Sequence, residues 1–205
     1  RSNQYNGTME GLKLETNKTL IYSIKNVMQL INNSILMLRD MDKALSKYSF
    51  EPINGNAIGT ETSKNILQTP KQTATFFPQY MARPYALKSD IDEQQTNKIL
   101  FINIQFFHPD YNELTPTLIS GVIVSPRPMT DIKNEVKNWW LKNIAFEISN
   151  YEDIKKNGDI NEVTDEGNYK NIFWCKDLTL FEGQESINEE AEKLVKVFNN
   201  TLVNA

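Results

Sequence analysis

Two apolar runs joined by a polar turn between residues 98 and 125 constrain the fold of this chain more than any other stretch. In the first run, Leu100 and every second residue after it point to one face of an extended chain, while Phe101 and its alternate neighbours point to the other. The second run, residues 118–124, is rich in the β-branched side chains that are typical of strands. Its Gly121 indicates a bulge or a place where another backbone comes close. The pattern predicts an antiparallel hairpin at the centre of a sheet, with one face buried.

The size and composition of the chain limit the class of protein to which it can belong. Its 205 residues, 40% of them hydrophobic, can bury one substantial core. The net charge of −4 offers no broad positive field for a phosphate backbone, so we predict no nucleic-acid partner. The single cysteine, Cys175, excludes an intrachain disulfide framework and any zinc site made of cysteines alone.

The sequence leaves the cellular location open between cytoplasmic and extracytoplasmic. Asparagine, lysine and isoleucine are among its commonest residues, which fits a bacterial source. No apolar run is long enough to cross a bilayer. We therefore expect membrane attachment only through a segment that is absent from these residues.

A long amphipathic helix is predicted over residues 17–47, after a polar and flexible first 16 residues. Its apolar residues alternate between spacings of three and four, with Ser34 as the one interruption: Leu20, Ile24, Val27, Ile31, Leu38, Met41 and Leu45. Ile21 and Met28 widen this stripe beyond the seam of a two-stranded coiled coil. The breadth favours a helix that packs on its own domain, and the alternative is that part of it is a partner surface.

Residues 73–87 read as extended, but Pro78 and Pro84 lack the amide that a central strand must donate. The segment is therefore predicted to lie at a sheet edge or to be broken into two short pieces. Its aromatic side chains could line a groove for a partner, or they could cover the rim of the core. The candidate partner-binding residues are Phe77, Tyr80, Arg83 and Tyr85, together with Trp139 from a helix predicted over residues 131–148.

The remaining elements indicate an α+β fold. Residues 150–170 are acidic and punctuated by glycine, which predicts a surface loop, and residues 171–181 alternate like a strand. Ser186 and Glu189 form a capping-box pattern ahead of a final amphipathic helix. We predict an antiparallel sheet of about four strands with helices on one face. The predicted organisation is residues 1–47 as flexible segment and helix, 48–72 as connecting loop and 73–205 as α+β domain, one globular unit overall.

The only histidine, His108, lies in the predicted hairpin turn near Asp110 and Glu113. This grouping could shuttle a proton or share a metal ion, but an exposed turn histidine is the favoured interpretation. Cys175 is interpreted as a buried structural thiol, since a nucleophilic cysteine needs a base beside it. We predict no catalytic residue, no metal and no cofactor.

Three functions follow from these patterns. The first is a non-enzymatic protein-interaction or assembly domain that uses the long helix and the aromatic edge strand. The second is an extracytoplasmic ligand sensor or fibre subunit, because a long helix leading into an antiparallel sheet is similar in outline to type IV pilin-like subunits and to bacterial receptor sensory domains. The chain lacks the cysteine pair of many pilins. The third is a small metal-dependent hydrolase or nuclease centred on His108.

Overall fold

The structure is a computed structural model, and it describes residues 4–58, 78–107, 114–135, 158–164 and 167–202. For residues 4–14 and Lys133 it describes the backbone alone. The chain divides into two compact units, Arg1–Arg39 and Asp40–Ala205. Helix α1, Gln4–Ser46, begins in the first unit, and its residues 40–46 belong to the second.

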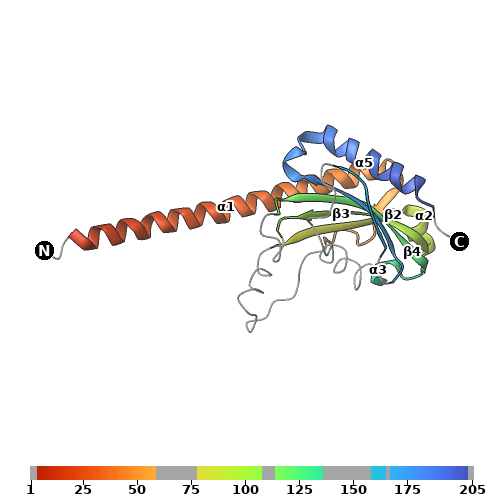
Figure 1. Ribbon diagram of the computed structural model, residues 1–205, viewed down its shortest axis with the longest axis horizontal. Helices are drawn as coiled ribbons and strands as arrows, with labels where there is room; N and C mark the ends of the chain where they lie inside the picture. Colours follow the sequence, from red (N-terminus) through yellow and green to blue (C-terminus); the bar gives the residue numbers. More distant parts are fainter. Residues whose placement is uncertain (1–3, 59–77, 108–113, 136–157, 165–166, 203–205) are drawn as a thin grey trace. The chain divides into compact units, whose positions relative to one another are not determined.

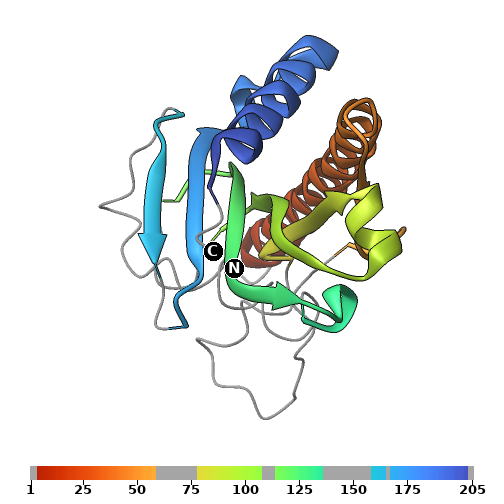
Figure 2. The same cartoon turned by 90° about the vertical axis from the view of Figure 1, so that its right-hand side faces the viewer.

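The second unit is built on an antiparallel sheet whose strand order is β1-β2-β3-β4-β6-β5. Figure 2 shows β5, in cyan, at the outer side of the sheet beside β6. The predicted α+β class is confirmed, with six strands in place of about four. The strands are β1 Phe50–Pro52, β2 Tyr80–Leu87, β3 Thr96–Gln105, β4 Thr117–Met129, β5 Asn161–Thr164 and β6 Lys170–Asp177.

The predicted hairpin is confirmed at the centre of this sheet, where β3 pairs with β4 and each has a second strand on its other side. Both faces of β3 are buried, since Ile102 is 0% exposed and Phe101 on the opposite face is 3% exposed. The sequence predicted burial of one face only. Gly121 lies opposite Phe101, and a Cβ atom there would come within 2.5 Å of both the Ile172 carbonyl oxygen and the Phe101 ring. The close approach predicted at Gly121 is therefore present.

One face of the sheet is covered by helix α5, Gly183–Asn200 (Figure 1), and by residues 40–46 of α1. The Phe198 ring of α5 meets the Phe50 ring of β1 edge-on, with centroids 4.9 Å apart. The Lys98 ammonium group of β3 donates to the carbonyl oxygens of Phe198 (2.8 Å) and Thr201 (3.1 Å). These bonds satisfy acceptors at the end of α5, which has no further helical turn to use them.

The opposite face carries the second part of the core. Because side chains alternate along paired strands, the residues beside Phe101 in the register share its face. The short helix α3, Ile132–Glu135, adds Ile132 to this group. The cluster consists of Ile53, Ala86, Ile99, Phe101, Ile119, Ile123, Met129, Ile132, Phe173 and Cys175.

Several predicted boundaries differ from those observed. Helix α1 begins at Gln4, well before residue 17, and the short helix α2, Lys88–Glu93, lies between β2 and β3. Strand β6 ends at Asp177, whose carboxylate accepts from the Thr179 amide (2.9 Å) and starts the 3-10 turn η3, Leu178–Leu180. Of the helix predicted over residues 131–148, the structure describes α3, and the rest lies outside the described residues.

The predicted capping box at Ser186 is wrong. Helix α5 already begins at Gly183, which has a positive φ of 81°, and Ser186 lies inside its first turn. The Ser186 hydroxyl donates back to the Glu182 carbonyl oxygen (3.3 Å), so it caps no amide of the helix. The final helix is amphipathic as predicted, with Ile187, Ala191, Leu194 and Phe198 buried on one side, and Leu202 lies beyond its end and is exposed.

Candidate functional site

The predicted partner-binding residues do not gather on one surface of β2. Register places Tyr80 on one face of the sheet and Arg83 and Tyr85 on the other. All three are buried, with exposed fractions of 2%, 5% and 0%. Phe77 and Trp139 lie outside the described residues. The described part of β2 therefore offers side chains to the core, and a partner-binding role for these five residues stays a prediction.

Strand β2 is continuous over its described length and its first part alone lies at the sheet edge, so the prediction of an edge or broken segment holds in part. Strand β1 pairs with its last residues, and Pro78 precedes it. The Pro84 carbonyl oxygen accepts from the Ile53 amide (3.0 Å) on the β1 side. Because the N and O atoms of one residue point the same way in an antiparallel strand, the donor that proline lacks also faces β1. Proline is tolerated here because no bond to β3 is lost.

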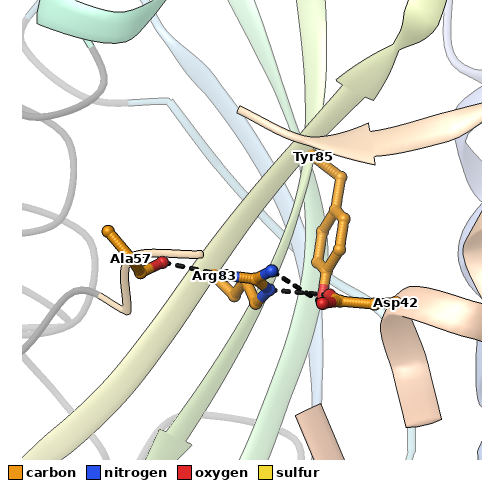
Figure 3. A network of polar contacts seen from close by, with 4 residues as sticks. All are labelled: Asp42, Ala57, Arg83 and Tyr85. Carbon is orange, nitrogen blue, oxygen red and sulfur yellow. Dashed lines mark hydrogen bonds and ion pairs between the residues drawn. The ribbon is translucent and has the colours of Figure 1, made fainter. Parts of the chain in front are cut away.

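A charged network joins the end of α1 to β2 and is the most developed polar site in the described residues (Figure 3). The Arg83 guanidinium donates to both Asp42 oxygens, from Nε to Oδ1 and from Nη2 to Oδ2, each at 2.6 Å. Its Nη1 donates to the Ala57 carbonyl oxygen (2.9 Å), and the Tyr85 hydroxyl donates to Asp42 Oδ1 (2.9 Å). A bidentate pair of this kind fixes direction as well as distance.

The electrostatics of this network favour the ionised pair. Burial alone would lower the pKa of Arg83, but the hydrogen bonds and charge of Asp42 outweigh it and raise that pKa. Burial raises the pKa of Tyr85 well above its ordinary value of 10.0, and the Asp42 carboxylate raises it further. The donors and acceptors of the network are satisfied by one another, so its chemistry is that of a structural clamp.

Because the Tyr85 phenol is buried, we expect the folded protein to lose stability in alkali. Above pH 10.0 the unfolded chain releases this proton while the folded chain keeps it, so the free energy of unfolding falls as pH rises. The slope reaches at most about 1.4 kcal/mol per pH unit for one group. Urea unfolding from about pH 8 to about pH 11 should show the stability gap between the wild type and Tyr85→Phe narrowing.

A buried carboxylate, Glu190, lies between α5 and β6. Glu190, 1% exposed, accepts from the Trp174 indole nitrogen (2.5 Å) and from the Lys176 ammonium group (2.7 Å). Lys193 stands over the Trp174 ring, 4.4 Å from its centroid, and donates to the Gly158 carbonyl oxygen (2.6 Å). Sequence reasoning missed this site, although Glu190 lies three residues after Ile187 on the apolar stripe of α5. An acidic residue on the apolar side of a helix indicates a buried carboxylate with a hydrogen-bond or charged partner, and this pattern could have predicted the site.

No metal centre is found among the residues that the structure describes. They contain no group of three or more His, Cys, Asp or Glu side chains placed to hold a metal ion. His108, Asp110 and Glu113 lie outside the described residues, so the metal-dependent hydrolase or nuclease stays a prediction. Cys175 is buried in the core cluster, at 3% exposure.

Four large exposed apolar residues lie close together on α1 in the first unit. Leu20, Ile21, Ile24 and Met28, here called the α1 stripe, fall within about 100° of one another around the helix. Their exposed fractions are 59%, 52%, 51% and 64%. In the second unit the same spacing continues at Met41 and Leu45, which are fully buried. Among the described residues, no helix is both long and apolar enough to span a membrane.

Comparisons of the chain with protein-family models, with curated proteins and with solved structures find no match.

Proposed function

We propose that this chain is a non-enzymatic protein-interaction or assembly domain and that the α1 stripe is its partner surface. The observation that carries the proposal is the exposure of four large apolar side chains on one side of a helix. Scattered exposed apolar residues are ordinary, but a contiguous group of them costs free energy in water and is typical of interaction sites. An amphipathic helix of this kind binds through its apolar face.

The second unit supports the assignment of the partner surface to α1. Two of its ion pairs hold elements of the unit together, Asp42 with Arg83 and Glu190 with Lys176, at separations of 2.6 and 2.7 Å. The aromatic side chains of β2 that the structure describes are buried and contribute to the core. The exposed large apolar residues of the second unit, among them Ile160, Val163, Leu180 and Leu202, are spread over several elements, whereas those of the α1 stripe lie together on one helix.

Charged substitutions on the α1 stripe test the proposal. The triple variant Leu20→Glu, Ile24→Glu and Met28→Glu should abolish the larger complex that contains this chain, measured by size-exclusion chromatography of extracts from its native cells. Glutamate is a good helix former, so helix content should be retained. Exposed positions tolerate substitution within about 0.5 kcal/mol, so the thermal midpoint should stay within a few degrees.

A matched control places the same three charges on the other side of the helix. Thr19, Asn26 and Asn33 are spaced by seven residues and are exposed, and Asn26 lies about 200° around the helix from Ile24. Glutamate at these three positions should leave the complex intact. The proposal fails if both triple variants behave like the wild type, or if both lose the complex equally.

A further inference from the structure

We infer that the partner of the α1 stripe is the same stripe on a second copy of this chain, in a parallel coiled coil in which equal positions of the helices meet. The inference rests on the proposed function and names its partner. Three properties of α1 carry it: the period of its apolar residues, the position of its charges and the position of one asparagine.

The period of the apolar residues favours a helix as the partner. From Leu20 to Ile31, and again from Leu38 to Leu45, the apolar residues of α1 recur at intervals of four and three, which average 3.5 residues. An α-helix has 3.6 residues per turn, so such a stripe drifts by about 20° per heptad along a straight axis. A flat surface can hold such a stripe for a few turns, as the second unit does at Met41 and Leu45. A second helix that winds around the first stays aligned with the exposed residues Leu20, Ile24 and Met28.

The charges favour an identical partner. Within residues 17–38 the charged side chains are Lys18 and Lys25, and both lie about 100° or more around the helix from Ile24. The positions that flank the apolar seam are uncharged, so two copies meet without repulsion between like charges. An acidic partner or an anionic lipid surface would find few cations beside the seam with which to pair.

Asn17 favours the parallel arrangement in which equal positions meet. It lies seven residues before Ile24 and therefore on the same seam, and it is exposed in the single chain. An amide buried without a hydrogen-bond partner costs about 1–3 kcal/mol. In the parallel arrangement each Asn17 meets the other Asn17. In antiparallel registers it would face Leu20, Val27 or Ser34, and Ser34 is already buried, with its hydroxyl bonded to the Leu30 carbonyl oxygen (2.8 Å).

Disulfide trapping in the purified full chain tests the inference. Ile24→Cys, kept under mild oxidation, should form a covalent dimer, because equal positions on the seam bring the two thiols together. Asn26→Cys, on the far side of the helix, should give at least roughly tenfold less dimer, since association raises the effective thiol concentration toward millimolar at the seam. The wild type should give none, because its single cysteine is 3% exposed. Sedimentation equilibrium should give a mass of twice 23.7 kDa or more.

Different failures separate this inference from the proposed function. A purified wild-type chain that is monomeric up to high concentration overturns the inference. If the native complex is still lost in the Leu20→Glu, Ile24→Glu, Met28→Glu variant, the partner is another protein and the proposed function stands. Equal cross-linking of Ile24→Cys and Asn26→Cys overturns the parallel seam. Binding to anionic phosphatidylserine vesicles without self-association also overturns the inference and assigns the stripe to a lipid surface.

Discussion

Asp42→Ala is expected to lower the free energy of unfolding by about 3 kcal/mol, the lower end of the range for breaking a buried ion pair, since Asp42 is a quarter exposed. The substitution leaves the Arg83 side chain, 6% exposed, with the Ala57 carbonyl oxygen as its remaining acceptor. It also removes the acceptor of the Tyr85 hydroxyl. Urea unfolding followed by circular dichroism measures the loss.

Two further variants show whether burial is the cause. Asp40→Ala, two residues earlier, breaks an ion pair with Lys43 whose side chain is 70% exposed, so a change within about 0.5 kcal/mol is expected. Asp42→Leu combined with Arg83→Met replaces both charges by apolar groups and should be more stable than Asp42→Ala alone. A loss below about 1 kcal/mol for Asp42→Ala would show that the network contributes little.

Gly121→Ala is expected to cost about 3 kcal/mol, at the upper end of overpacking effects, and Gly121→Val to leave little folded protein. The added Cβ atom would lie 2.5 Å from the Ile172 carbonyl oxygen of β6 and 2.5 Å from the Phe101 ring of β3. The ring can move, but the carbonyl oxygen is fixed by the pairing of β4 with β6. Thermal unfolding of the alanine variant gives the cost.

A double variant tests whether the Ile172 carbonyl oxygen or the Phe101 ring obstructs a side chain at residue 121. Phe101→Leu added to Gly121→Ala relieves the ring contact and leaves the backbone contact, so we expect little recovery of the stability lost at Gly121. Gly55→Ala is the control for conformation alone, because Gly55 has a φ of 58° and open space around it. That variant should lose about 1 kcal/mol. Full recovery by Phe101→Leu would contradict the assignment of the backbone as the obstacle.

The parts of the fold predicted correctly from sequence are those with strong local patterns. The alternating run from Leu100 and the β-branched run at residues 118–124 predicted the central hairpin, because period and composition both indicate strands there. The close approach at Gly121 followed from a glycine inside a strand pattern. The period of three and four gave α1 and α5 for the same reason.

The missed strands have no comparable local pattern. Strand β1 has three residues and follows Ser49, whose positive φ of 63° turns the chain at a residue type that sequence reasoning does not mark for such a turn. Strand β5 has four residues, mostly exposed, and pairs on one side with β6. Pairing with an existing strand defines both elements, and propensity within three or four residues is too weak to predict them.

The charged sites depend on tertiary contacts and were missed for that reason. Asp42 lies beside the apolar stripe of α1, and its partner Arg83 follows 41 residues later. Arg83 and Tyr85 were selected from the sequence as accessible groups, yet the alternation of β2 turns both toward the helices. The α1 stripe itself was predictable, because heptad spacing is visible in one segment. Its exposure was not, since burial depends on what packs beside it.

The order of the strands also has a consequence for folding kinetics. The pairs β2–β3, β3–β4 and β5–β6 close through the connections at residues 88–95, 106–116 and 165–169, whereas β1–β2 and β4–β6 close over residues 53–79 and 130–169. Short closures form first, because distant contacts must first overcome the entropy of the loop between them. Substitutions in the central strands therefore act mainly on the rate of folding, and those in β1 and α5 mainly on the rate of unfolding.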